Sequence, residues 1–173
     1  SDRIAVMRDG KVHQIGTSKE IYNSPATAFV ASFIGDMNFI TAAIKSAGKP
    51  VSGAEFAGNT VYYNGEKYTA GNGESVLYCI RTERITVDPK GKTDNKIEAK
   101  IERVVFRGID YEITCSVGNA VIRIVENSLS RDHAFSVGDM VDIGWATEDV
   151  VVFPICEIDE VVKYETGLTV CEE

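Results

Sequence analysis

The pattern that most constrains this fold is an alternation of apolar and polar residues in the second half of the chain. Apolar side chains occupy every second position from Ile97 to Ile101 and again from Tyr111 to Val117, with charged or polar residues between them. A period of two places one face of a strand in a core and the other in water. Turn residues such as Gly118-Asn119 separate the segments, so the pattern predicts short strands in a barrel or sandwich.

The first half of the chain predicts more strands of the same kind. We expect strands at 38–46 and 75–81, the second apolar on both faces and therefore central, and a loop at 47–58. We also expect a hairpin of 60–63 and 66–69 around Asn64-Gly65.

In the second half, further strands are predicted at 120–125, 141–145 and 149–153, with a bulge at Val104-Val105 that bends the long strand from residue 96. Together the strands predict a mainly β fold of two OB-like units, roughly 38–90 and 96–155, that share a core.

Residues 1–35 differ from the rest. Ile4 to Met7 and Val12 to Ile15 flank Asp9-Gly10, a dipeptide typical of tight hairpins. Thr17 and Glu20 then have the spacing of a capping box at the start of a short helix.

A second helix is expected to follow, with Ser24 as its cap, Pro25 in its first turn and Gly35 as its stop. Its apolar side chains, Phe29, Val30, Phe33 and Ile34, are predicted to share one face. A helix this short is unstable alone, so that face needs a partner.

Composition excludes several functions. The chain has 173 residues, 44% hydrophobic and 25% charged, which is typical of a globular protein with a core. Its formal charge of −8 disfavours nucleic acid and anionic membranes as partners. The charge is explained by solubility, with an acidic surface that attracts a cationic solute as the alternative.

The metal-binding side chains are few and scattered. Cys79, Cys115, Cys156 and Cys171 are the four cysteines, and no pair has the CxxC spacing of a zinc site. Cys79 and Cys115 fall in apolar strands and are predicted to be core thiols, a usage that suits a reducing cytoplasm. His13, on the hairpin, is expected at the surface, and no metal site is predicted.

The first 35 residues resemble a known family. Ser-Asp-Arg-Ile-Ala-Val-Met, Asp-Gly-Lys, Gln-Ile-Gly-Thr, Glu-Ile-Tyr and Phe-Val-Ala-Ser-Phe-Ile-Gly, between Ser1 and Gly35, are similar to the end of the nucleotide-binding domain of an ATP-binding-cassette (ABC) importer ATPase. The resemblance is to the branch that imports polyamines, sugars, sulfate or iron. In that branch this stretch leads into a regulatory β domain with OB-like folds, the transport-associated OB (TOBE) domain.

Three later segments resemble that domain's motifs, and they supply the candidate structural residues. Ile80-Arg81-Thr82-Glu83 is similar to its Leu-Arg-Pro-Glu signature, with Thr82 where Pro is usual. Phe106-Arg107-Gly108, followed by Tyr111, is similar to its Phe-x-Gly turn, and 137–141, followed by Trp145, is similar to its last turn and closing strand. The residues carried over from the family are Arg81, Glu83, Phe106, Gly108, Gly138, Asp139 and Trp145.

The resemblance implies a division of the chain and a set of partners. Residues 1–37 would be the end of the nucleotide-binding domain, 38–158 the β domain and 159–173 a tail. The parent would be cytoplasmic, held at the inner face of the membrane by permease subunits, and would use ATP and Mg. A second copy of the subunit would make a homodimer, with Phe29, Val30, Phe33 and Ile34 as a possible interface. Spermidine or putrescine is the first guess for the solute.

No catalytic or cofactor-binding residue is predicted in this stretch. Gly91-Lys92-Thr93 looks like the end of a phosphate-binding loop, but Thr86 stands where that loop needs Gly, and a strand follows instead of a helix. Ile158-Asp159-Glu160 imitates a Walker B end without the apolar strand before it. We therefore expect the fragment itself not to be an enzyme.

Two other functions remain open. A small-ligand sensor could bind the solute or an oxyanion through the loop cations Arg131, Lys90, Lys92 and Lys96. An OB-fold nucleic-acid binder would need a basic groove with aromatic platforms. The aromatic cluster Tyr62, Tyr63, Tyr68 and Tyr78 is better explained by packing, with Tyr62 and Tyr68 as cross-strand neighbours.

Overall fold

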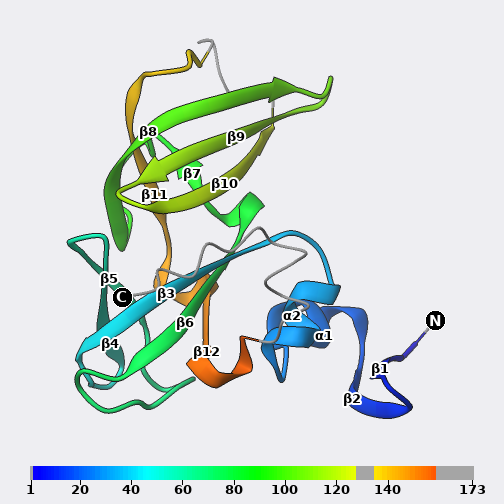
Figure 1. Cartoon of the computed structure of the whole chain (residues 1–173). Helices are drawn as coiled ribbons and strands as arrows, with labels where there is room; N and C mark the ends of the chain where they lie inside the picture. Colours follow the sequence, from blue (N-terminus) through cyan, green and yellow to red (C-terminus); the bar gives the residue numbers. More distant parts are fainter. Residues whose placement is uncertain (1, 128–134, 159–173) are drawn as a thin grey trace.

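The computed structural model describes residues 2–127 and 135–158 and confirms a mainly β fold (Figure 1). The chain opens with a hairpin of β1 (Ile4–Arg8) and β2 (Lys11–Gly16), followed by the helices α1 (Ser18–Asn23) and α2 (Ala28–Phe33). Asp9 and Gly10 have φ of 49° and 73°, as a tight hairpin turn requires. This hairpin was predicted correctly.

Ten strands in two five-stranded sheets make up the rest of the described chain. Sheet I has the order β12-β6-β3-β4-β5, and its strands are β3 (Met37–Ser46), β4 (Val51–Phe56), β5 (Asn59–Asn64), β6 (Ser75–Arg81) and β12 (Val150–Pro154). Sheet II has the order β10-β9-β8-β11-β7, and its strands are β7 (Thr86–Val87), β8 (Asn95–Phe106), β9 (Asp110–Val117), β10 (Ala120–Asn127) and β11 (Met140–Trp145). The 3₁₀ turns η1 (Thr82–Arg84), η3 (Thr147–Asp149) and η4 (Ile155–Glu157) follow β6, β11 and β12.

The two sheets are built from two copies of one unit. Unit 1 runs from β3 to β7 and unit 2 from β8 to β12, and each has three antiparallel strands, a fourth strand, a 3₁₀ turn and a fifth strand. The fifth strands are exchanged, because β7 pairs with β11 of unit 2 and β12 pairs with β6 of unit 1. Neither unit therefore completes its sheet without the other.

Backbone hydrogen bonds repeat from one unit to the other. The Gly73 N–H donates to the Ile44 carbonyl at 2.7 Å, and the Gly138 N–H donates to the Ile101 carbonyl at the same 2.7 Å. The pairing register shifts directly after Ile44 in β3 and directly after Ile101 in β8. Residues 38–44 and 95–101 share the sequence Asn-x-Ile-x-Ala-x-Ile, so the duplication is also visible in the sequence.

The asparagine that opens each repeat joins one unit to the other. The Asn95 side chain accepts from the Tyr62 N–H at 2.6 Å and donates to the Tyr62 carbonyl at 3.0 Å. The Asn38 side chain does the same for Arg123, with distances of 2.7 Å and 2.8 Å. Each amide thus takes the place of a strand partner on an edge strand of the opposite sheet, β5 or β10. These two brackets close the sheets around a common core.

The shared core of the two sheets is apolar. It contains the inward side chains of both sheets, including Tyr63, Tyr78, Ile143 and Trp145, all buried. The Trp145 indole N–H donates to the Tyr78 hydroxyl at 2.9 Å, which in turn donates to the Tyr62 carbonyl. Trp145 therefore faces inward from β11 and is buried in the shared core.

Several predicted boundaries were wrong in the first half. The expected loop at 47–58 contains strand β4, and β4 pairs with β5 through a turn at Ala57-Gly58. Residues 66–69 form no strand, so Tyr62 lies opposite Gly53 and not near Tyr68 in a hairpin. The small side chains of β4 hid its periodicity, and the turn places Ala57 at φ 47°, which Ala seldom adopts.

Two further details differ from the predictions. The bulge in β8 directly follows Ile101 and so precedes the predicted Val104-Val105. It lies where the Ile101 carbonyl accepts from the Gly138 N–H. The second helix is capped by Thr27, whose side chain accepts from the Val30 N–H at 3.3 Å, and not by Ser24. The capping box of Thr17 and Glu20 is confirmed.

Candidate functional site

Helix α2 is the point at which the N-terminal segment meets the β sheets. Ala28 and Ala31 are fully buried against Phe39 and Leu77 on the outer face of sheet I. Figure 1 shows α2 beside the end of sheet I, with the β1–β2 hairpin farther out. This contact explains why β6 is apolar on both faces: one face lines the shared core and the other holds α2.

Arg81 fastens the end of this helix to sheet I. One guanidinium nitrogen donates to the Ile34 carbonyl, and the other donates to the Tyr22 carbonyl at 2.8 Å. The guanidinium carbon lies 3.8 Å from the centroid of the Tyr22 ring, close enough for a cation–π contact. Burial, and to a smaller extent the charge of Arg84, lowers the pKa of Arg81 to about 10, so the side chain stays charged at neutral pH.

Glu157 holds the other end of the same helix. Its carboxylate accepts from the Ala28 N–H at 2.9 Å. A negative charge at the start of a helix and a positive charge at its end both interact favourably with the helix dipole. Glu157 and Arg81 therefore make a two-ended clamp on α2, which we call the α2 clamp.

Gly35 is part of the reason that the clamp closes. Its φ of 79° lets the chain leave α2 toward β3, and a Cβ there would lie 3.3 Å from the Arg81 guanidinium. The prediction of Gly35 as the helix stop is confirmed. Glu157 and Tyr22 were not predicted, because Glu157 lies 129 positions from Ala28 and no local pattern connects them.

The other motif residues lie apart from the clamp. Glu83 is exposed beside Thr82, whose hydroxyl lies 3.3 Å from its carboxylate. Phe106 is exposed at the β8–β9 tip, where its ring centroid is 5.1 Å from that of Tyr111, and Gly108 has a φ of 91° in the same turn.

Gly138 and Asp139 form the turn before β11. Asp139 accepts from the Ser136 N–H at 3.2 Å through its carboxylate. With Trp145 in the core, these residues shape turns and strands. None of them lies in a shared cavity with the clamp.

The predicted apolar face of α2 is divided. Val30 is fully buried against Val6 and Ile21, while Phe33 is 63% exposed. Phe29 is partly buried, and the centroid of its ring lies 4.9 Å from that of the His13 ring. The interface role of Phe29, Val30, Phe33 and Ile34 stays a prediction.

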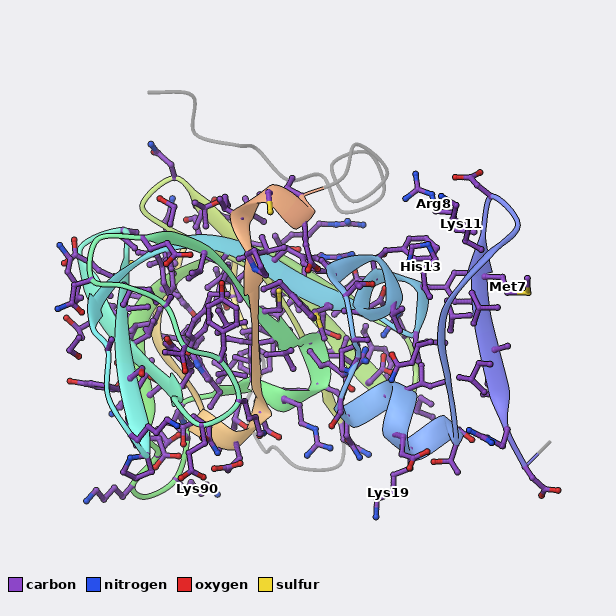
Figure 2. All side chains as sticks on the ribbon, turned by 90° about the horizontal axis from the view of Figure 1, so that it is seen from below. Met7, Arg8, Lys11, His13, Lys19 and Lys90 are labelled. Carbon is purple, nitrogen blue, oxygen red and sulfur yellow. The ribbon has the colours of Figure 1, made fainter. Side chains whose placement is uncertain are left out.

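The candidate ligand cations are described only in part. Lys96 pairs with Asp142 at 2.7 Å, and Arg131 lies outside the described residues. Figure 2 places Lys90 on the opposite side of the molecule from Arg8, Lys11 and His13 of the hairpin.

The loop that resembles a phosphate site is a packing element. The Thr93 hydroxyl donates to the Trp145 carbonyl at 3.1 Å, and no helix begins there. In the Walker-like segment 158–160, only Ile158 lies within the described residues.

A hollow of about 330 Å³ lies beside the clamp. Its walls are Ile4, Ser18, Lys19, Ile21, Tyr22, Asn23 and Ile34, so it adjoins the residues that Arg81 holds. Among the described residues, no group of metal-binding side chains is large enough to hold an ion. No helix in that part is long and apolar enough to span a membrane. Cys79 and Cys115 are buried thiols, as predicted.

Comparison with known proteins identifies the family of the chain. A family model described as the TOBE domain matches residues 78–153. The spermidine/putrescine import ATP-binding protein PotA of Spiroplasma citri is 35% identical over 160 residues, and that of Borreliella afzelii is 34% identical over 153. The match covers 88% of this chain in both cases and 40% of each relative. The chain belongs to the family of ABC importer ATPases and contains their TOBE domain.

A solved structure supports the fold of the TOBE region. The cytoplasmic molybdate-binding protein ModG has a TM-score of 0.56 and 9% identity, and the likeness covers 68% of this chain and 95% of that one. At this identity the likeness shows the fold alone. The chain spans about two fifths of the length of the importer relatives it matches, so the activity of a whole protein is taken up as a proposal below.

Proposed function

We propose that this chain is the C-terminal regulatory and dimerisation part of the ATPase subunit of an ABC importer. In this proposal the subunit couples ATP hydrolysis to the uptake of a small solute. It works with permease subunits at the inner face of the membrane and with a second copy of itself. ATP and Mg bind to the part of the subunit that contains its phosphate-binding motifs.

The α2 clamp is the observation that carries the regulatory role. A movement of the hairpin and α1 pulls on α2, and α2 is held at both ends by sheet I and the turn that follows β12, through Arg81 and Glu157. A rigid connection of this kind passes a change of position from the nucleotide-binding part to the β domain and back. The relatives named as spermidine/putrescine import proteins favour a polyamine as the solute.

The experiment uses the complete importer in membrane vesicles. We compare Arg81→Ala with Arg84→Ala, because Arg84 is an exposed neighbour that pairs only at the surface, with Asp149 at 3.4 Å. Spermidine uptake and ATP hydrolysis are measured on the same vesicles. Arg81→Ala is expected to lower the uptake per ATP hydrolysed, because ATP turnover is no longer transmitted through α2, and Arg84→Ala is expected to leave it unchanged.

Two results would count against the proposal. Uptake per ATP that is unchanged in Arg81→Ala, with the subunit folded by thermal melting, would refute the regulatory role of the clamp. Vesicles that import another solute but no polyamine would refute the choice of substrate while leaving the regulatory role standing.

A further inference from the structure

Four side chains form a basic and aromatic surface where the β1–β2 hairpin meets α2. The guanidinium carbon of Arg8 lies 5.0 Å from the centroid of the Phe29 ring, and the centroid of the His13 ring lies 4.9 Å from it. The Phe33 ring follows one turn along α2, with its centroid 6.2 Å from that of Phe29. Phe33 is 63% exposed, and His13 is exposed as well. We call these four residues the Phe29 stack.

The Phe29 stack is separate from the other apolar surface of the hairpin. That surface consists of Met7, Val12 and Ile15, all exposed. In Figure 2, Met7 points away from α2, whereas Arg8 and His13 lie on the side of the hairpin that faces α2. A partner that covers the Met7 side, such as the rest of the subunit, therefore leaves the stack open.

The described chain ends beside the start of α2. Ile158 is the last described residue, and it packs against the cluster that contains Ala28 and Ala31. The carboxylate of the preceding residue, Glu157, accepts from the Ala28 N–H at 2.9 Å, and Phe29 is the next residue of the helix. The tail, residues 159–173, lies outside the described residues, and a chain of its length spans up to about 50 Å when extended. Since the six residues of α2 are only about 9 Å long, the tail can reach every part of the stack.

The tail and the N-terminal segment differ in their charge balance. Residues 159–173 contain five acidic side chains and one basic, whereas residues 1–35 contain three acidic and four basic, in a chain of net charge −8. Arg8 pairs with Asp9 at 3.5 Å, and Lys11 and His13 beside them keep this end of the hairpin basic (Figure 2). The tail also has apolar residues between its acidic ones, as in 160–165, Glu-Val-Val-Lys-Tyr-Glu. Tethered this closely, such a segment has an effective concentration of about a millimolar, so a weak contact is enough.

We propose that the tail folds back over α2 and docks on the Phe29 stack. Its apolar side chains cover the ring of Phe33, and its carboxylates lie beside Lys11 and His13. The contact adds a third hold on the helix that Arg81 and Glu157 clamp, and it opposes movement of the hairpin relative to sheet I. This inference goes beyond the proposed function and does not depend on it, because the contact forms within one chain.

The first test is cross-linking in the complete subunit, with Cys156 and Cys171 replaced by Ser. Phe33→Cys together with Tyr164→Cys should form an intrachain disulfide on mild oxidation. The control combines Tyr164→Cys with Thr69→Cys, an exposed position that is also near the start of the tail, since burial and then nearby charges that include Glu157 raise the pKa of the adjacent Tyr68. The Phe33 pair is expected to cross-link about tenfold faster, because docking holds the tail on one side of its tether. Equal rates, or a disulfide that forms only between two copies, would overturn the proposal.

The second test reverses one charge beside the stack in the Phe33→Cys and Tyr164→Cys background. Lys11→Glu is expected to slow the cross-link about threefold at low salt, because an exposed attraction becomes a repulsion. The matched control is Lys19→Glu, an exposed lysine of α1 that Figure 2 places far from Lys11, and it should leave the rate unchanged. If the two variants have equal rates, the charge of the hairpin does not direct the tail and the proposal is wrong. The uptake experiment with Arg81→Ala would be unaffected, so the two proposals fail separately.

Discussion

The two asparagine brackets give a prediction that the structure itself can calibrate. Asn95→Ala removes the acceptor for the Tyr62 N–H and the donor to the Tyr62 carbonyl, at 2.6 Å and 3.0 Å. Each such hydrogen bond contributes about 1 kcal/mol net. In the variant the Tyr62 carbonyl keeps its bond from the Tyr78 hydroxyl. Since β5 is an edge strand and Tyr62 is 42% exposed, water can reach the freed N–H, and the lower end of the penalty applies. We expect a loss of about 2 kcal/mol in the free energy of unfolding.

Urea unfolding followed by circular dichroism measures this loss. Asn38→Ala should cost a similar amount, because it frees the same two groups of Arg123 on the other edge strand. The control is Asn119→Ala, in an exposed turn, where a change within about 0.5 kcal/mol is expected. If Asn95→Ala unfolds at the same urea concentration as the control, the brackets do not close the sheets and the reasoning is wrong.

Three further predictions concern the core, the packing of a loop and a helix cap. Trp145→Ala should lower the free energy of unfolding, measured by thermal melting, by about 3–5 kcal/mol, because it leaves a cavity in the shared core and removes the indole N–H that bonds to the Tyr78 hydroxyl. Gly144→Ala should also destabilise, because its Cβ would lie 2.7 Å from a Thr93 carbon and 3.0 Å from a backbone oxygen; a melting temperature equal to that of the wild type would contradict this. Hydrogen bonds from the Thr17 N–H and hydroxyl hold the pKa of Glu20 below its usual value, so the cap of α1 is intact at neutral pH. As the pH falls through that pKa, the cap weakens and the helical signal in circular dichroism should fall. In Glu20→Gln this pH dependence should be absent.

Much of the fold could be predicted because its signals are local. Alternation in β8, β9 and β10 fixed which faces are buried, and Asp9-Gly10 fixed the first hairpin. The failures fall where the local signal is weak or misleading. Strand β4 consists largely of small residues, and its turn uses Ala57, so neither periodicity nor turn residues mark it.

The site was predicted only in part, for a physical reason. The resemblance singled out Arg81, but not what it holds, because its partners Tyr22 and Ile34 are distant in sequence. No sequence pattern pointed to Glu157. The duplication is visible in the sequence, because the pattern Asn-x-Ile-x-Ala-x-Ile occurs at both 38–44 and 95–101 and shows that these two strands correspond.

The central claim is that the β sheets hold α2 through Arg81, and amide hydrogen exchange tests it most directly. The Ala31 and Ile34 N–H groups are bonded inside the helix, to the Thr27 and Val30 carbonyls at 3.0 Å and 3.3 Å. Arg81→Ala removes two charge-assisted hydrogen bonds and a cation–π contact, about 3 kcal/mol together.

We therefore expect these two amides to exchange roughly 100-fold faster in Arg81→Ala, since 1.4 kcal/mol is a factor of ten. Exchange in β8 and β9 should stay unchanged, and Arg84→Ala should behave as the wild type. Equal exchange of the α2 amides in Arg81→Ala and the wild type would contradict the clamp, and with it the proposed route between the N-terminal segment and the β sheets.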